Sequence, residues 1–297
     1  MPTCDLTLAM DVFGEVDDLP DPIPRHLHEI MSLADDLIIG RVTADTEAII
    51  DACDPQGINW HRPHRAFGSQ YGIARLARPG HSYQFDPDLR LRTCVQLSRV
   101  AHPTALSFIF AGRLTTDNDG AIVEFSPARL LGGGRHAFVA DPAHNWLDDD
   151  HVAVLRQLLA SFSPDVLPQR VLNALFYHEY VHQLQTFDAR WPMATTGLES
   201  LVHTDRHGST RQFVERLLGL QATLGLVLAN EGDLLAIYDR RSTLAHGQTL
   251  GGMTPENKRL YELLELVLRT TIKNAILNSV FGDLFRDDVT IRATWPV

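Results

Sequence analysis

The chain has 297 residues, of which 44% are hydrophobic and 21% are charged. It can therefore bury a core as one large domain or two of ordinary size, and collagen-like, coiled-coil and wholly disordered classes are excluded. The formal net charge of −11 argues against the extended basic surface that non-specific duplex binding needs, although a local arginine-lined groove stays possible. The three cysteines are widely spaced and form no C-x-x-C pattern, which favours a reducing cytoplasm over a disulfide framework or a cysteine-rich zinc site.

The sequence predicts neither a secretory signal nor a membrane span. The first residues lack a basic segment followed by an apolar one, which a signal peptide requires. The longest apolar stretch, Leu217–Ala229, is shorter than the roughly 20 residues that cross a bilayer. We therefore expect a cytoplasmic protein that does not enter the membrane.

The first half of the chain is predicted to mix strands and helices. Segments rich in β-branched and other apolar residues, separated by turn residues, predict strands. These segments are Thr3–Phe13, Arg92–Val100, Thr104–Leu114 and Ala121–Phe125. The segment Ile23–Ile39 follows Pro22 and is predicted to form an amphipathic helix.

The second half is predicted to be helical throughout. Apolar residues recur at spacings of three and four, and N-terminal signals open the segments. Those signals are Asp148–Asp150, Pro168, the capping-box pattern Ser209–Gln212, and Thr254 followed by Pro255. A further helix is expected over 231–245. The predicted fold class is therefore α+β: a mixed α/β-strand domain over 1–145, then an all-α helical domain over 146–297.

The string His178-Glu179-Tyr180-Val181-His182 is the first candidate site. Residues four apart share a helix face, so both imidazoles can bind one Zn²⁺ while Glu179 acts as general base on a bound water. This interpretation predicts a zinc-dependent hydrolase. The alternative is a helix whose two histidines lie at an interface or groove.

A zinc hydrolase of this type also needs a third ligand. The extended H-E-x-x-H-x-x-G-x-x-H form is absent, because Gln185 and Ala189 stand at its glycine and last histidine. Glu199 or Glu231 would then have to complete the site.

The second candidate is Arg241-Ser-Thr-Leu-Ala-His246, followed by Gly247. This spacing is weak alone but gains weight from its context. The string IYDRRSTLAHG, which contains it, ends one predicted helix, and a long apolar helix, YELLELVLRTTIKNAIL, follows after a short loop. In this order, residues 165–297 resemble the Apea-like branch of the HEPN superfamily, the higher eukaryote and prokaryote nucleotide-binding helical domains. Ser242 departs from the Asn, Asp or His that often follows the arginine in active members.

The resemblance implies a helical bundle, commonly a homodimer, whose R-x(4–6)-H motif forms a ribonuclease site without a metal ion or other cofactor. Arg241 and His246 match the two fixed positions of this motif. Many such proteins act in toxin–antitoxin or antiviral defence systems, with an antitoxin or defence partner, whereas others are silent dimerisation or sensing modules. The two candidate sites compete, because a zinc hydrolase places its H-E-x-x-H helix beside a sheet.

The chemistry of the second candidate is RNA cleavage or RNA binding. An imidazole can move the proton of the RNA 2′-OH or of the leaving 5′-oxygen, and a guanidinium can hold the phosphate. Arg241 and His246 are about 140° apart on an ideal helix, so a two-fold dimer would bring two pairs into one cleft. Glu199 is expected to steady Arg241, and Arg240 is a neighbouring cation. The structural alternative is a helix C-terminus whose basic side chains satisfy free carbonyls.

Overall fold

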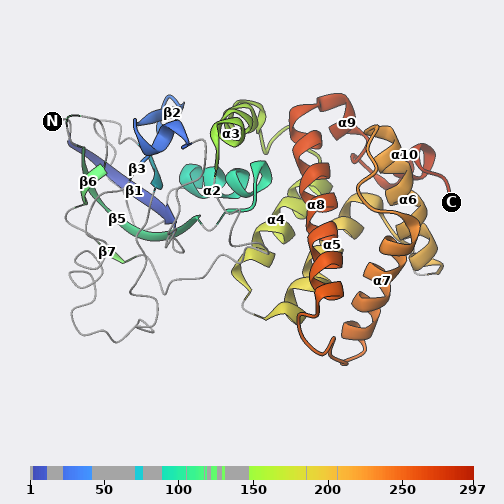
Figure 1. Cartoon of the computed structure of the whole chain (residues 1–297). Coiled ribbons are helices and arrows are strands. Elements are labelled where there is room, and N and C mark those ends of the chain that lie inside the picture. Colours follow the sequence, from blue (N-terminus) through green and yellow to red (C-terminus); the bar gives the residue numbers. More distant parts are fainter. Residues whose placement is uncertain are drawn as a thin grey trace. The chain divides into compact units, whose positions relative to one another are not determined.

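The computed structural model (Figure 1) describes residues 3–11, 23–41, 71–75, 89–104, 106–116, 118, 122–125, 129–130, 147–184, 186–205 and 207–297. The chain divides into two compact units, Met1–Ala160 (unit 1) and Ser161–Val297 (unit 2). Unit 1 combines a sheet with helices, and every regular element described in unit 2 is a helix. The fold class is therefore α+β.

Unit 1 is built on an antiparallel sheet with the strand order β2-β3-β4-β1-β5-β6, in which β7 also pairs with β5. Strand β1 is central and runs along β5 from the pair Thr3–Thr115 to the pair Asp11–Leu106. The strands are β1 Thr3–Asp11, β2 Met31–Ala34, β3 Leu37–Arg41, β4 Tyr71–Arg75, β5 Leu106–Thr116, β6 Ile122–Phe125 and β7 Arg129–Leu130. The strands predicted at 3–13, 104–114 and 121–125 correspond to β1, β5 and β6.

The strand predicted over 92–100 is wrong, because this segment lies in helix α2, Leu89–Ala101. Its buried side chains include Leu91, Cys94, Ser98 and Ala101, which recur at the three-to-four spacing of a helix face. That face contacts strands β1, β4 and β5. The predicted strand began after Leu91 and covered too few residues to show the helical spacing of the buried side chains. The β-branched residues within it therefore suggested a strand.

The helix predicted over 23–39 is also wrong. The segment forms a short 3-10 turn, η1 Arg25–Leu27, and then the hairpin of β2 and β3. Met31 and Leu33 are buried while Ser32 between them is exposed, which is the alternation of a strand. The two adjacent acidic residues, Asp35 and Asp36, form the turn, and short polar side chains of this kind favour turns over helix interiors.

Helix α3, Asp149–Ser161, belongs largely to unit 1. The Arg156 Nε donates to the Ser32 carbonyl oxygen at 2.7 Å, and the Arg25 backbone N–H donates to Asp149 Oδ1 at 2.9 Å. These bonds hold α3 on the β2 strand and the η1 turn. The division between the two compact units falls between residues 160 and 161.

Unit 2 consists of helices, of which α8 is the longest (Figure 1, red). Helix α8 contacts α4, α5, α7 and α9. The helices are α4 Gln169–Gln183, α5 Phe187–Val202, α6 Ser209–Thr223, α7 Glu231–Ala245, α8 Pro255–Leu277, α9 Ser279–Asp283 and α10 Asp288–Thr294. Trp191, Phe213 and Phe285 are its largest fully buried side chains. Within the described ranges, no helix has the length and apolar character of a membrane span.

One helix start in unit 2 differs from its prediction. The N-cap of α6 is Gly208, with φ +72°, so Ser209 is already the first residue of the helix. No side chain makes a capping hydrogen bond at this helix start. The capping box fails because the Gln212 Oε1 accepts instead from the Asp205 backbone N–H at 2.7 Å. Thr254 does cap α8 as predicted, since its hydroxyl accepts from the Asn257 backbone N–H at 3.2 Å.

Candidate functional site

Helix α7 presents two faces, and the two residues of the R-x4-H motif lie on different ones. One row of side chains points into the bundle and ends at the surface: Leu234, Ile237, Tyr238 and Arg241. A second row at helical spacing is exposed or half-buried: Leu235, Asp239, Ser242 and His246. A single chain therefore does not direct the arginine and the histidine to the same side.

Arg241 is held by Glu199, which lies on α5. The Arg241 Nη2 is 3.2 Å from Glu199 Oε2, and the Tyr238 hydroxyl donates to the other oxygen, Oε1, at 3.3 Å. The guanidinium also lies 5.6 Å from the centre of the Tyr238 ring. Burial raises the pKa of Tyr238, so its hydroxyl stays protonated and remains a donor. The expected contact between Glu199 and Arg241 is present.

His246 ends α7, but its side chain is not what satisfies the helix carbonyls. Gly247, with φ +78°, donates to the Leu244 carbonyl oxygen at 3.0 Å, and the Gln248 N–H donates to that of Thr243 at 3.2 Å. This is the backbone pattern of a Schellman C-terminus. The imidazole is exposed and makes no hydrogen bond or ion pair with any described residue. Ser242 contributes its carbonyl oxygen, which accepts from the His246 N–H at 3.1 Å.

Arg240 links α7 to the start of α8. Its Nε donates to Asn257 Oδ1 at 2.7 Å, and its Nη2 lies 3.0 Å from Glu256 Oε1. The Asn257 amide in turn donates to the carbonyl oxygens of Leu250 and Gly252. The guanidinium therefore fixes the loop between the two helices, and the structure gives Arg240 a scaffolding contact instead of a free surface charge.

The H-E-x-x-H string lies on α4, and its two histidines are buried. The His178 Nε2 is 3.1 Å from Oε1 of Glu265, on α8, and the His178 and His182 ring centres are 4.9 Å apart. One ligand atom from each of these three residues lies within 4.8 Å of the others. The third member of this group is therefore the acidic residue Glu265, which was not among the residues predicted from the sequence.

The remaining features of this string do not favour a hydrolase. Glu179 accepts from its neighbour Gln183 at 3.0 Å. Of the two acidic residues considered as third ligands, Glu199 pairs with Arg241, and Glu231 is exposed in the first turn of α7. Helix α4 contacts the helices α5 and α8. Within unit 2, these contacts place the H-E-x-x-H helix in a helical bundle.

Glu265 is kept anionic in the core. The Arg269 Nε lies 2.9 Å and 3.2 Å from its two carboxylate oxygens. Burial alone would raise the pKa of Glu265, but Arg269 and the hydrogen bond from His178 outweigh this effect and lower the pKa to about 2. One signal in the sequence could have revealed this residue, since Glu265 interrupts the apolar side of α8 directly after Leu264.

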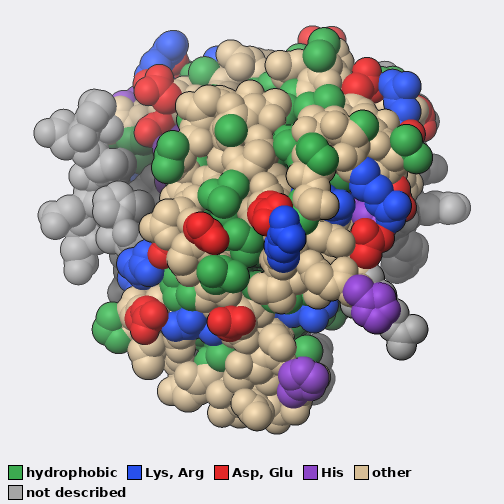
Figure 2. All heavy atoms as spheres, turned by 90° about the vertical axis from the view of Figure 1, so that its right-hand side faces the viewer, with side chains coloured by type: hydrophobic (Ala, Val, Ile, Leu, Met, Phe, Trp, Pro, Cys, Tyr) green, Lys and Arg blue, Asp and Glu red, His purple; other side chains and the backbone are tan. Residues whose placement is uncertain are grey.

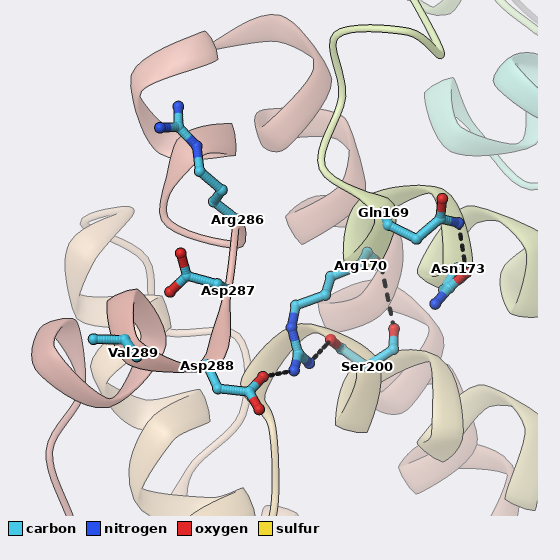
Figure 3. Close-up of a pocket in the computed structure, with 8 residues that line it drawn as sticks. All are labelled: Gln169, Arg170, Asn173, Ser200, Arg286, Asp287, Asp288 and Val289. Atoms are coloured by element: carbon cyan, nitrogen blue, oxygen red, sulfur yellow. Dashed lines mark hydrogen bonds and ion pairs between the residues drawn. The ribbon is translucent and has the colours of Figure 1, made fainter.

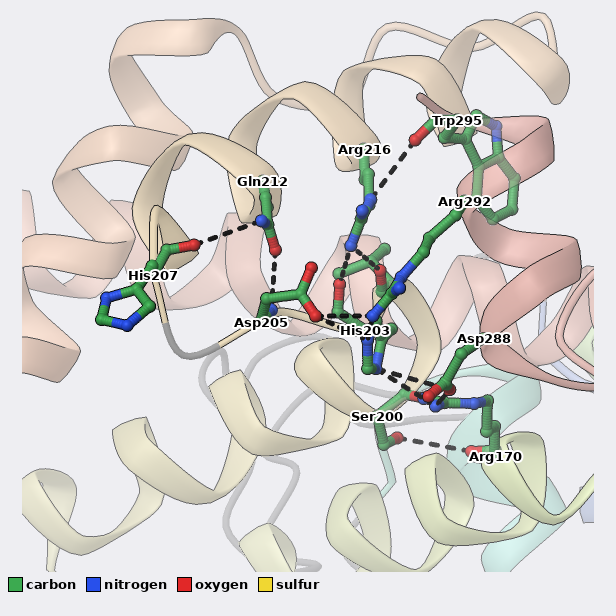
Figure 4. A network of polar contacts seen from close by, with 11 residues as sticks. Arg170, Ser200, His203, Asp205, His207, Gln212, Arg216, Asp288, Arg292 and Trp295 are labelled. Carbon is green, nitrogen blue, oxygen red and sulfur yellow. Dashed lines mark hydrogen bonds and ion pairs between the residues drawn. The ribbon is translucent and has the colours of Figure 1, made fainter. Parts of the chain in front are cut away.

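A second polar cluster surrounds His203 at the end of α5 (Figure 4). The ring Nδ1 lies 3.3 Å from Arg170 Nη2, and Nε2 lies 3.3 Å from Asp205 Oδ1 and 3.0 Å from Arg292 Nη2. Arg216 donates to the His203 carbonyl oxygen. His203 has φ +49°, which makes it the one non-glycine residue with positive φ in the described part of the chain.

An open pocket lies beside this cluster, between α4, the end of α5 and the start of α10 (Figure 3). It is lined by Gln169, Arg170, Asn173, Ser200, Arg286, Asp287, Asp288 and Val289. Arg170 binds the carboxylate of Asp288 and donates to the Ser200 carbonyl oxygen at 2.7 Å. The Arg170 guanidinium therefore holds the start of α10 on α4, whereas Arg286 pairs locally with Asp283 at 2.6 Å.

Comparisons with known proteins give no match: no family model, no curated protein and no solved structure is similar to this chain at a significant level. The functional interpretation therefore depends on the contacts of the chain's own side chains.

Proposed function

We propose that unit 2 is a HEPN-like module that binds RNA and cleaves it without a metal ion, and that Arg241 and His246 are its catalytic residues. One observation supports this most directly. The Arg241 guanidinium is fixed at the surface by Glu199, and five residues later the His246 imidazole is exposed with no partner among the described residues. The proposal that this protein acts as a toxin or in antiviral defence depends only on the resemblance of its sequence to the HEPN superfamily.

The reaction uses a nucleophile that belongs to the RNA. The 2′-oxygen attacks the adjacent phosphorus, the bond from phosphorus to the 5′-oxygen breaks, and a 2′,3′-cyclic phosphate forms. Imidazole exchanges protons near neutral pH, so His246 can take the 2′-OH proton or supply one to the leaving oxygen. The forked donors of Arg241 stabilise the charge on the phosphate oxygens.

Because Arg241 and His246 lie on different faces of α7, the proposed site requires a second copy of the chain. Arg241 and His246 are about 140° apart around an ideal helix, so the arginine of one protomer and the histidine of another would form each site. The exposed row of α7, which includes Leu235 with 38% of its surface accessible, is the surface we assign to this two-fold contact.

The charge of unit 2 limits the proposed RNA contact to a few phosphates. Residues 161–297 contain 13 basic and 15 acidic side chains, a net charge of −2. Acidic and basic side chains are interspersed on the face in Figure 2. Since each neutralised phosphate adds to the salt dependence of binding, RNA affinity should fall only weakly with salt.

The test compares wild type, His246→Ala and Arg241→Ala on a mixed cellular RNA pool, with and without EDTA. We expect cleavage by wild type in both buffers, cyclic phosphate ends, and loss of cleavage in both variants. His207→Ala is the matched control, because His207 is another exposed histidine of unit 2. Equal cleavage by wild type and His246→Ala would remove His246 from the mechanism, and inactivity of wild type on every RNA would favour a silent module.

A further inference from the structure

We infer that His178, His182 and Glu265 form a buried three-ligand binding site for a divalent transition metal ion, best suited to Zn²⁺, which joins helix α4 to helix α8. The RNA site proposed on α7 uses none of these residues and needs no metal. This inference therefore goes beyond the proposed function and is independent of it.

The spacing of the donor atoms fits a zinc ion. Zinc bonds to imidazole nitrogen and carboxylate oxygen are about 2.0–2.1 Å long, so two ligand atoms of a tetrahedral site are about 3.3 Å apart. The His178 Nε2 and Glu265 Oε1 are 3.1 Å apart. All three ligand atoms lie within 4.8 Å of one another, so small side-chain rotations bring His182 to the same ion.

The position of each ligand has a structural cause. His178 and His182 are one helical turn apart on α4, which places both rings on one face. The centres of the two rings are 4.9 Å apart and the ring planes are inclined by 69°. This arrangement is compatible with two imidazoles that bind the same ion. Glu265 comes from the facing helix α8, so the ion would bridge two elements that are 87 residues apart in sequence.

Neighbouring side chains make hydrogen bonds to the proposed ligands. A metal-binding carboxylate is usually hydrogen-bonded by a second group that orients it, and the Arg269 Nε lies 2.9 Å and 3.2 Å from the two Glu265 oxygens. The His178 Nδ1 is buried and has no hydrogen-bond partner in the described part of the chain. In a zinc complex bound through Nε2, this Nδ1 would carry the ring proton, so the supporting hydrogen bonds of the site come from Arg269 on the carboxylate side.

The burial of the ligands favours a structural ion over a catalytic one. His178, His182 and Glu265 have 1%, 3% and 9% of their surfaces exposed, so a water would take the fourth tetrahedral position out of reach of a substrate, which a catalytic zinc must admit there. Glu179, the general base of the hydrolase interpretation, is bonded to Gln183 at 3.0 Å. Metal binding would therefore stabilise the α4–α8 contact through coupling to folding.

The experiment measures zinc content and thermal unfolding of the full-length protein. Protein is stripped with EDTA, dialysed, titrated with ZnCl₂ and analysed by mass spectrometry for bound metal. We expect about one zinc per chain and a rise in Tm of about 3 °C or more over the stripped protein. Less than about one zinc per ten chains with an unchanged Tm would overturn the site and leave a metal-free network of His178, Glu265 and Arg269.

Variants locate the ion. His178→Asn and Glu265→Gln should each lose the stoichiometric zinc and the zinc-dependent rise in Tm, while His207→Asn, a change at an exposed histidine, should keep both. Zinc retained by His178→Asn at the wild-type level would place the ion elsewhere and overturn the proposal.

Co²⁺ titration of the wild-type protein gives a reading that does not depend on variant folding. Visible absorption bands of a tetrahedral cobalt site are expected, and purely octahedral, weak absorption would count against the site. RNA cleavage in EDTA is a separate readout, so failure of this proposal and failure of the RNA site are distinguishable.

Discussion

Glu199 on α5 and Arg241 on α7 form an ion pair, with Oε2 and Nη2 3.2 Å apart. Their side chains are 14% and 32% exposed, so the pair lies at the edge of the core, where one side of the guanidinium remains open. The Tyr238 hydroxyl holds the second carboxylate oxygen. The arrangement fixes the direction of Arg241 while leaving donors for a phosphate.

Glu199→Gln should weaken RNA cleavage through Arg241 with little effect on folding. The amide oxygen can still accept from Tyr238, but the charge that orients Arg241 is lost. We expect a fall of about tenfold in the single-turnover rate, equivalent to about 1.4 kcal/mol, and a loss of about 0.5–1 kcal/mol in the free energy of unfolding, because the pair is partly screened. Glu231→Gln, at an exposed carboxylate, is the control. An unchanged rate would show that the ion pair has no part in cleavage.

A mixture of two inactive variants should recover activity if the site is shared between protomers. In a dimer of one Arg241→Ala chain and one His246→Ala chain, one composite site keeps both residues and the other loses both. Random exchange makes half the dimers mixed, so the equimolar mixture should reach about a quarter of wild-type activity. Each variant measured alone after the same exchange treatment is the control. No recovery, in a mixture whose mixed dimers are detected by native mass spectrometry, would place the whole site within one chain.

Arg240→Met should loosen the loop between α7 and α8. The substitution removes the donor to Asn257, a residue with 6% of its surface exposed, and leaves its buried oxygen without that partner. We expect a loss of about 1–3 kcal/mol in the free energy of unfolding and faster proteolytic cleavage within residues 248–253. Arg259→Met is the control, since Arg259 also pairs across α7 and α8 but is 54% exposed and should cost less than about 1 kcal/mol. Equal losses would contradict the scaffolding role of Arg240.

The sequence predicts the helices of unit 2 well because their signals are local. Pro168, Thr254 and Pro255 mark helix starts through their own backbone and side-chain chemistry, and α4 and α8 begin where these residues predict. Unit 1 is predicted less well because its short segments take their structure from the sheet. Residues 92–100 have β-forming side chains, yet they form a helix because that face packs against β1, β4 and β5.

The candidate sites show the same division between local and distant information. The Arg241–His246 spacing and the His178–His182 spacing lie within single helices, so the sequence alone identifies them. The partner of His178 is 87 residues away on α8, and only the packing of α4 on α8 brings Glu265 to it. The contact of Glu199 with Arg241 spans 42 residues and was predicted from the order of helices, without its geometry.

His203→Gly should be more stable than His203→Ala, although both lose the imidazole. The residue has φ +49°, a positive value that L side chains rarely adopt and that glycine, which has no Cβ atom, tolerates better. We expect the glycine variant to be more stable by about 1 kcal/mol or more in denaturant unfolding at pH 7.5. If alanine were tolerated equally well, the backbone at the end of α5 would not require this conformation.

The imidazole of His203 should make the stability of unit 2 depend on pH. Burial, followed by the nearby Arg170 guanidinium, lowers the pKa of His203 below its ordinary value of 6.5, against the opposing effect of Asp205. The folded protein therefore holds this ring neutral at pH values where the unfolded chain already binds a proton. Stability from this group is present above about pH 6.5 and is lost as the pH falls toward the lowered pKa. We expect the free energy of unfolding of wild type to fall between pH 7.5 and 5 by more than that of His203→Gly, measured by denaturant titration at fixed ionic strength.

His26 in unit 1, whose pKa burial lowers to about 4, acts in the same direction in both proteins and cancels in this comparison. A pH dependence of equal slope in the two proteins would show that His203 titrates alike in the folded and unfolded states.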